Sequence, residues 1–73
     1  MRVISTTDLS RHGYDGYIHE AVSLVEQFGI YSVINFFKIE YRAREDVSVF
    51  KYTMDYEEAK NAYICHGGKL DVD

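Results

Sequence analysis

Proline and tryptophan are absent from this chain, cysteine occurs once, and the hydrophobic runs are short. A single thiol cannot form an internal disulfide, which excludes the disulfide scaffolds of small secreted domains. No apolar stretch reaches the roughly 18 to 20 residues of a membrane-spanning helix, so we expect no membrane contact. The first residues lack the apolar core of a signal peptide. These absences together favour a reducing, cytoplasmic location.

The residues that are present describe one globular domain over residues 1–73. Hydrophobic residues make up 47% of the chain and charged residues 27%, which is typical of a folded protein. A chain of this size buries only about 60% of its unfolded surface, so its stability is small. We therefore expect a protein partner, either another protein or a second copy in a homodimer.

The clearest pattern is a pair of alternating runs on either side of the polar residues 43–46. In the first run Phe37, Ile39 and Tyr41 alternate with Lys38, Glu40 and Arg42, and in the second Phe50, Tyr52 and Met54 alternate with Lys51 and Thr53. A period of two predicts an antiparallel hairpin with one buried face and one wet face. We expect the six apolar side chains of this pattern to face the helices.

Other elements are predicted from end signals and spacing. Residues 2–6 are rich in β-branched side chains and predict a strand. Residues 17–28 predict a helix that begins after Asp15 and ends at Gly29, with apolar residues at helical spacing. A second helix is predicted from Asp55, an N-cap, to the glycines at 67 and 68. Residues 69–73 alternate and predict a short last strand.

The predicted order is therefore strand, helix, strand, strand, helix, strand. This β-α-β-β-α-β order predicts an α+β, ferredoxin-like two-layer sandwich with an antiparallel sheet. The alternative is a mostly α fold with residues 30–42 helical, because Ile30, Val33, Ile34, Phe37 and Tyr41 also fit a helical stripe. The density of β-branched and aromatic residues favours strands over that alternative.

Groups able to support metal binding or catalysis are few. The transition-metal ligand types His12, His19, Cys65 and His66 have no spacing typical of a zinc site, so we predict no metal and no cofactor. Cys65 and His66 are adjacent on a helix and cannot face each other as a nucleophile and its base. The sequence also lacks a phosphate-binding loop. We therefore expect that the protein is not an enzyme.

The outward face of the predicted sheet carries a mixture of apolar and charged side chains. We predict a partner-binding surface there, made of Ile34, Phe36, Lys38, Glu40, Arg42, Val47, Val49 and Lys51. The net charge is −4, and residues 45–73 hold the whole imbalance, with three basic and seven acidic side chains. A negative field repels phosphate, so nucleic acid is not the expected partner.

The function predicted from these features is that of a small acidic protein-interaction module, a regulator or inhibitor that binds another protein. By analogy alone, such short acidic chains without catalytic motifs suggest a phage or other mobile-element origin. One alternative is a nucleic-acid-binding module that uses Phe36, Lys38, Arg42 and Lys51. A second is a small-ligand or metal-binding domain around the three histidines and Cys65.

Overall fold

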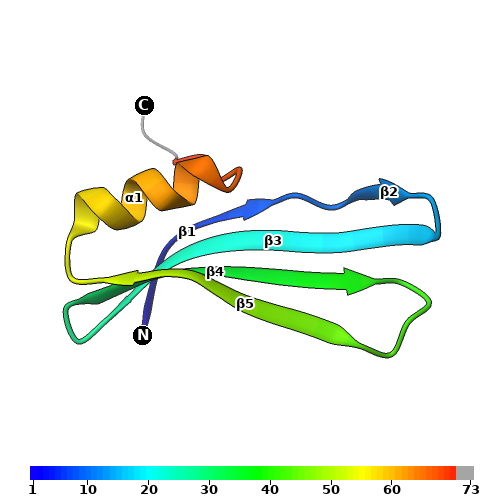
Figure 1. Cartoon of the computed structure of the whole chain (residues 1–73), viewed down its shortest axis with the longest axis horizontal. Coiled ribbons are helices and arrows are strands. Elements are labelled where there is room, and N and C mark those ends of the chain that lie inside the picture. The colour runs from blue at the N-terminus through cyan, green and yellow to red at the C-terminus, as the bar shows by residue number, and fades with distance from the viewer. Residues whose placement is uncertain (71–73) are drawn as a thin grey trace.

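The computed structural model describes residues 1–70 and shows a curved antiparallel sheet with one helix against one end of it (Figure 1). The strands are β1 (Arg2–Asp8), β2 (Arg11–Gly13), β3 (Gly16–Gln27), β4 (Ile30–Ile39) and β5 (Glu45–Thr53). The helix is α1 (Tyr56–Cys65). The order across the sheet is β1-β3-β4-β5, and β2 also pairs with β3, beyond the end of β1.

The ferredoxin-like prediction is wrong, because residues 17–28 form no helix. Residues 16–27 are the long central strand β3, which pairs with β1 on one side and β4 on the other. Its apolar residues fit a helical stripe because both faces of this central strand carry apolar side chains, so apolar and polar residues do not alternate strictly. Val22 and Leu24 are buried on one face, and Val25 is buried on the other.

The predicted stop at Gly29 is instead the second residue of a tight hairpin turn. Gln27 pairs with Ile30, and the two residues between them, Phe28 and Gly29, have φ of 55° and 79°. Two consecutive positive φ angles are the signature of a type I′ turn, whose twist matches that of the strands it joins. The mostly α alternative is also wrong, since residues 30–39 are strand β4.

The hairpin predicted around residues 43–46 is confirmed. Strand β4 pairs with β5 from Tyr31↔Thr53 to Lys38↔Glu45. The register shifts between Val33 and Ile34, because Phe50 is an extra residue in β5. Such a bulge reverses the side-chain alternation that follows it.

The predicted helix after Asp55 is confirmed, together with both of its ends. The Asp55 carboxylate accepts hydrogen bonds from the backbone N–H of Glu57 at 3.0 Å and of Glu58 at 3.4 Å. Beyond the last turn, the Gly68 N–H donates to the Tyr63 carbonyl at 2.8 Å and the Gly67 N–H to that of Ile64 at 3.1 Å. These two bonds form a Schellman motif, for which Gly67 supplies the positive φ of 94°.

The core lies between α1 and the sheet. It is formed by the fully buried side chains of Val22, Leu24, Val33, Ala59 and Tyr63. Residues 69 and 70 are not in a strand, and the remainder of the predicted last strand, residues 71–73, lies outside the described residues. The molecule measures 38 × 26 × 17 Å, and α1 covers only part of the long axis (Figure 1).

Candidate protein-binding surface

The face of the sheet away from α1 is not covered by any element among residues 1–70, and we call it the open face. The cross-strand register and the alternation of strands place its side chains. They belong to Val3, Thr6 and Asp8 of β1, His12 of β2, odd-numbered residues 17–27 of β3, even-numbered residues 30–38 of β4, and Glu45, Val47, Val49 and Tyr52 of β5. The opposite side, on which α1 packs, is the helix face.

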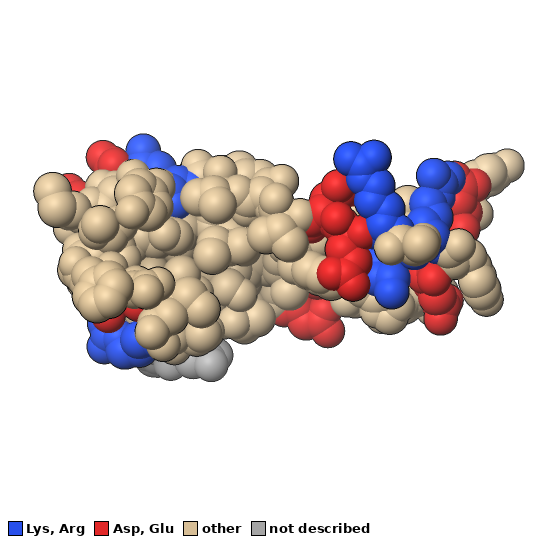
Figure 2. All heavy atoms as spheres, turned by 90° about the horizontal axis from the view of Figure 1, so that it is seen from below, with Lys and Arg blue, Asp and Glu red and all other residues tan. Residues whose placement is uncertain are grey.

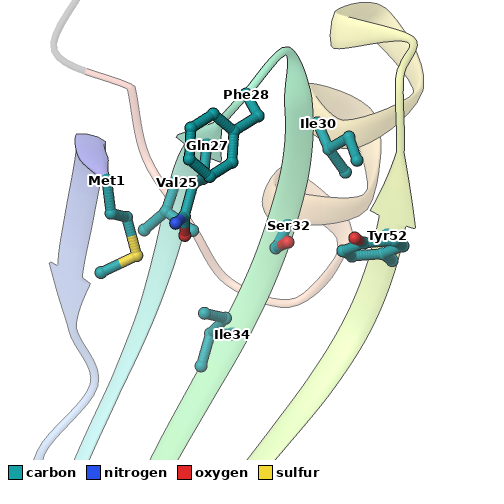
Figure 3. A pocket seen from close by; sticks show the side chains of 8 residues that line it. All are labelled: Met1, Val25, Gln27, Phe28, Ile30, Ser32, Ile34 and Tyr52. Atoms are coloured by element: carbon teal, nitrogen blue, oxygen red, sulfur yellow. The ribbon is translucent and has the colours of Figure 1, made fainter.

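A hollow with a volume of about 350 Å³ lies on the open face at the end nearest the β3–β4 turn. Its lining is mostly apolar and comes from β3, β4, β5, the β3–β4 turn and the residue before β1: Met1, Val25, Gln27, Phe28, Ile30, Ser32, Ile34 and Tyr52. Figure 3 shows these side chains on the near side of the ribbons, with α1 behind the sheet. We call this feature the apolar hollow.

Phe28 stands at the rim of the apolar hollow in an unusual conformation. Its side chain is 90% exposed, and its φ of 55° is in the left-handed region. A left-handed conformation costs a residue with a Cβ roughly 1–2 kcal/mol, so Asn or Gly is usual at this turn position. Neither burial nor backbone preference accounts for a phenylalanine here.

No charged side chain lines the apolar hollow, and a dense group of charged side chains lies at the other end of the molecule. Figure 2 views the molecule from the side away from α1 and shows a broad uncharged area with a few charged side chains at its border, and densely mixed Lys, Arg, Asp and Glu toward the other end. The β4–β5 connection lies at the charged end, where the Arg44 Nε is 3.3 Å from an Asp46 carboxylate oxygen. Separation of an apolar area from a polar border is typical of a protein contact surface.

Five of the eight residues predicted for partner binding share the open face: Ile34, Phe36, Lys38, Val47 and Val49. Glu40 and Arg42 follow the end of β4 and belong to its connection with β5. Lys51 lies on the helix face, where its ammonium group is 3.1 Å from the Glu58 carboxylate. The extra residue Phe50 reverses the alternation and is the reason for this last error.

The prediction that six apolar side chains of the hairpin all face the helices is also wrong: Phe37, Ile39, Tyr41, Phe50, Tyr52 and Met54. Phe37 and Ile39 are on the helix face, but both are only half-buried and neither belongs to the core beneath α1. Phe50 stacks on the His66 ring, with 4.0 Å between centroids. Tyr52 lies on the open face, and Tyr41, Tyr52 and Met54 are largely exposed.

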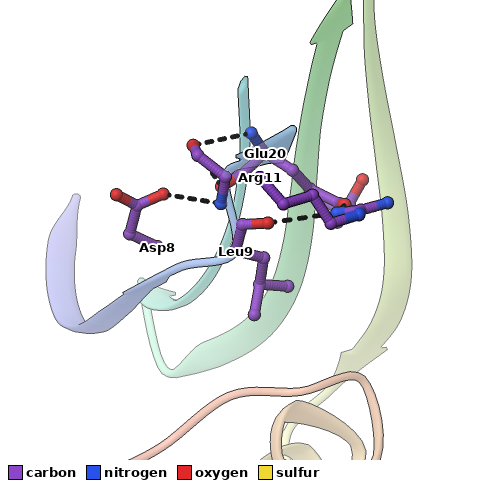
Figure 4. A network of polar contacts seen from close by, with 6 residues as sticks. Asp8, Leu9, Arg11 and Glu20 are labelled. Carbon is purple, nitrogen blue, oxygen red and sulfur yellow. Dashed lines mark hydrogen bonds and ion pairs between the residues drawn. The ribbon is translucent and has the colours of Figure 1, made fainter. Parts of the chain in front are cut away.

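A polar network joins the β1–β2 connection to β3 on the helix face (Figure 4). The Glu20 carboxylate accepts hydrogen bonds from the Arg11 guanidinium and, at 3.0 Å, from the Asn35 amide. The Arg11 guanidinium also donates to the Leu9 carbonyl at 3.0 Å. Burial acts to raise the pKa of Glu20, but these hydrogen bonds and the Arg11 charge together lower that pKa below its ordinary value.

Asp8 is the last residue of β1, next to this connection, and faces solvent. Its carboxylate accepts from the Ser10 backbone N–H at 2.9 Å, and the hydrogen bonds from Ser10 lower the pKa of Asp8. A proton-transfer group for neutral pH would need a raised carboxyl pKa, so neither Asp8 nor Glu20 is suited to that task. The network is a structural bridge across the gap between two short strands.

The residues of the predicted metal alternative lie on different sides of the sheet. His12 and His19 flank Tyr17 on the open face, with ring centroids 5.0 and 4.9 Å from that of Tyr17. Cys65 and His66 lie at the end of α1 on the helix face, so the four residues form no common site. Within residues 1–70, no three His, Cys, Asp or Glu side chains are placed to hold a metal ion together.

The four residues of the nucleic-acid alternative also fail to form one surface. Phe36 and Lys38 are on the open face, Arg42 is in the β4–β5 connection, and Lys51 pairs with Glu58 on the helix face. A binding site for a phosphate backbone needs a continuous basic track. These residues do not form such a track.

The sequence does not predict most of the apolar hollow, because the spacing of residues 17–28 predicts a helix. Val25 and Phe28 fall within that predicted helix, and Ile30 is not part of the predicted surface. One signal was available: Phe28-Gly29 is a two-residue, glycine-containing break between two apolar runs, which is a hairpin signature.

Within residues 1–70, the structure has no helix with the length and hydrophobicity needed to span a bilayer. Comparison of the chain with protein-family models, with curated proteins and with solved structures gives no match.

Proposed function

We propose that this protein is a non-enzymatic interaction module, a small regulator or inhibitor that acts by binding another protein through its open face. The observation that carries the proposal is Phe28, an exposed aromatic side chain held in a strained turn at the rim of the apolar hollow. Residues in sparsely populated backbone conformations cluster at binding sites, where the contact they make offsets the strain.

The surface around Phe28 supports the same proposal. Aromatic side chains are the usual anchors of protein interfaces, and both Phe28 and Tyr52 line the hollow. The accessible surface of 5149 Å² exceeds the roughly 4,700 Å² expected for a compact chain of this mass. The excess surface is consistent with a face that a partner covers.

A capture experiment with matched variants tests the proposal. The immobilised chain is incubated with lysate of the organism that carries the gene, with and without nuclease, and retained proteins are identified by mass spectrometry. We expect a nuclease-resistant protein partner. Phe28→Asn suits the turn and should lower the affinity for that partner about 30-fold or more, the effect of removing a contact-centre aromatic.

Tyr14→Asn is the matched control, because Tyr14 is a fully exposed aromatic at the β2–β3 turn, away from the apolar hollow. It should leave binding unchanged. Equal affinity of wild type and Phe28→Asn would contradict the proposal, and retention that nuclease abolishes would favour the nucleic-acid alternative.

A further inference from the structure

Strand β5 forms an open edge of the sheet and has no neighbour on its outer side among residues 1–70 (Figure 1). It is 9 residues long, and residues 45–50 are all exposed. Residues 47–50 carry no charge, and Val47 and Val49 are 65% and 60% exposed. A long apolar edge with unpaired backbone groups readily adds another strand.

The edge formed by β1 is protected in comparison. Register shifts do not distinguish the two edges, because β1 has one between Val3 and Ser5 and β5 has one at Phe50. The difference is the segment after α1, which lies against β1: Lys69 donates its backbone N–H to the Thr7 hydroxyl at 2.8 Å, and its carbonyl accepts from the Ser5 hydroxyl at 3.2 Å. Of the two edges, β5 is therefore the one prepared for a strand partner.

We propose that β5 pairs antiparallel with β5 of a second copy, about a two-fold axis that passes through Ser48. An axis perpendicular to the sheet keeps both helices on the same side, so residues opposite each other share a face. Val47 then lies opposite Val49 of the second copy on the open face. Cross-strand β-branched pairs of this kind stabilise a sheet.

Charge complementarity selects the second copy as the occupant. Because Phe50 is the bulged residue, the helix-face positions on either side of Ser48 are Asp46 and Lys51. The two-fold register places Asp46 of each copy opposite Lys51 of the other. Each of these residues already has a partner in its own chain, Arg44 for Asp46 and Glu58 for Lys51. The dimer would align the two pairs into a row of alternating charge, and networks of this kind are stronger than isolated surface pairs.

The neighbouring registers lack this complementarity. An axis through Val47 would place Lys51 opposite Arg44, two positive charges. An axis through Val49 would place Lys51 opposite Ser48 and Asp46 opposite Thr53, which pairs no charges. Like charges directly opposite each other are destabilising, so the register centred on Ser48 is favoured.

The dimer would have a single ten-stranded sheet, since each copy contributes 5 strands. The two open faces would become continuous, with an apolar hollow toward each end. The contact uses the edge of β5, which shares only Tyr52 with the apolar hollow and leaves Phe28 outside, so it can be tested separately from the function proposed above. An edge contact is small for a protein interface, so we expect a dissociation constant in the micromolar range that rises with salt.

Sedimentation equilibrium of the full chain between about 1 and 300 µM tests the inference. The wild type should be in a monomer–dimer equilibrium. Asp46→Lys and Lys51→Asp should each raise the dissociation constant at least about tenfold, since two symmetry-related pairs become repulsive in each homodimer. An equimolar mixture of the two variants should associate again, and the double variant Asp46→Lys/Lys51→Asp should dimerise like the wild type. Circular dichroism establishes that each variant is folded.

Val47→Lys should also weaken the dimer, whereas Val3→Lys, an exposed position on the same face at the β1 edge, should not. A wild type that remains monomeric at 300 µM would overturn the inference. So would two monomeric single variants that fail to associate when mixed, or a dimer that Phe28→Asn disrupts and the charge changes do not. Since Phe28→Asn tests the apolar hollow and the charge changes test the edge, failure of one proposal is distinguishable from failure of the other.

Discussion

Tyr63 is the side chain on which the docking of α1 depends most, and its replacement gives the sharpest test of the structure. It is fully buried and is the largest side chain in the core. Its hydroxyl is 2.9 Å from the Ser5 hydroxyl and 2.6 Å from the Thr7 hydroxyl, so it joins the helix to β1. The ring also packs against Gly68, where an added Cβ would approach ring carbons to 2.6 Å.

The hydroxyl and the ring of Tyr63 contribute different amounts to the free energy of unfolding. Tyr63→Phe removes the hydroxyl, and the hydroxyls of Ser5 and Thr7 keep the Lys69 carbonyl as an acceptor at 3.2 and 3.3 Å. No buried group is left without a partner, so the expected loss of unfolding free energy is about 1 kcal/mol. Tyr63→Ala leaves a cavity of aromatic size, for which losses of about 3–5 kcal/mol are usual. That is a large fraction of the roughly 4–11 kcal/mol available to a chain of this length.

Urea unfolding followed by far-UV circular dichroism measures both losses. With a slope of about 1 kcal/mol per molar urea, Tyr63→Phe should lower the unfolding midpoint by about 1 M and Tyr63→Ala by about 3–5 M. A loss below about 1 kcal/mol for Tyr63→Ala would refute the docking of α1 described here. Equal losses for the two variants would mean that the hydroxyl, not the ring, holds the helix.

Three further predictions concern pH, the turn and local stability. The pKa of Glu20 is lowered from a reference value of 4.5, so the stability that comes from its ionised form is present above that pH and is lost as the pH falls through the pKa of the folded state. Between pH 6 and 2.5 the melting temperature of Glu20→Gln should therefore fall less than that of the wild type, and parallel curves would contradict this. Phe28→Asn should raise the unfolding free energy by about 1 kcal/mol, because Asn tolerates the positive φ better than Phe, and the control Tyr14→Asn should stay within about 0.5 kcal/mol of wild type. A loss of stability for Phe28→Asn would disprove the strain. Hydrogen exchange should be slowest for the central strands β3 and β4 beneath α1 and faster in β5, and the reverse order would place the core elsewhere.

The elements that the sequence predicted correctly are those decided by neighbouring residues. Asp55 caps α1 with its own carboxylate, and the following glycines end the helix by local hydrogen bonds. The alternation around residues 43–46 likewise reports a hairpin whose strands are close in sequence. The helix prediction for residues 17–28 is wrong because their apolar spacing and end signals fit a helix as well as a strand with apolar side chains on both faces. The sheet on both sides of β3 settles the choice, and its partners come from other parts of the chain.

The candidate protein-binding surface was also predicted only where neighbouring residues decide its pattern. The sequence by itself determined that apolar and charged side chains alternate along residues 30–54 and that one face would be mixed. Only the tertiary structure decided which residues share that face, because the extra residue Phe50 changes the side for Lys51 and Tyr52. It also brought Met1, Val25 and Phe28 beside Tyr52 to form the apolar hollow. A bulge depends on how two strands align and a hollow on how several strands lie side by side, and neither is encoded in the spacing of adjacent residues.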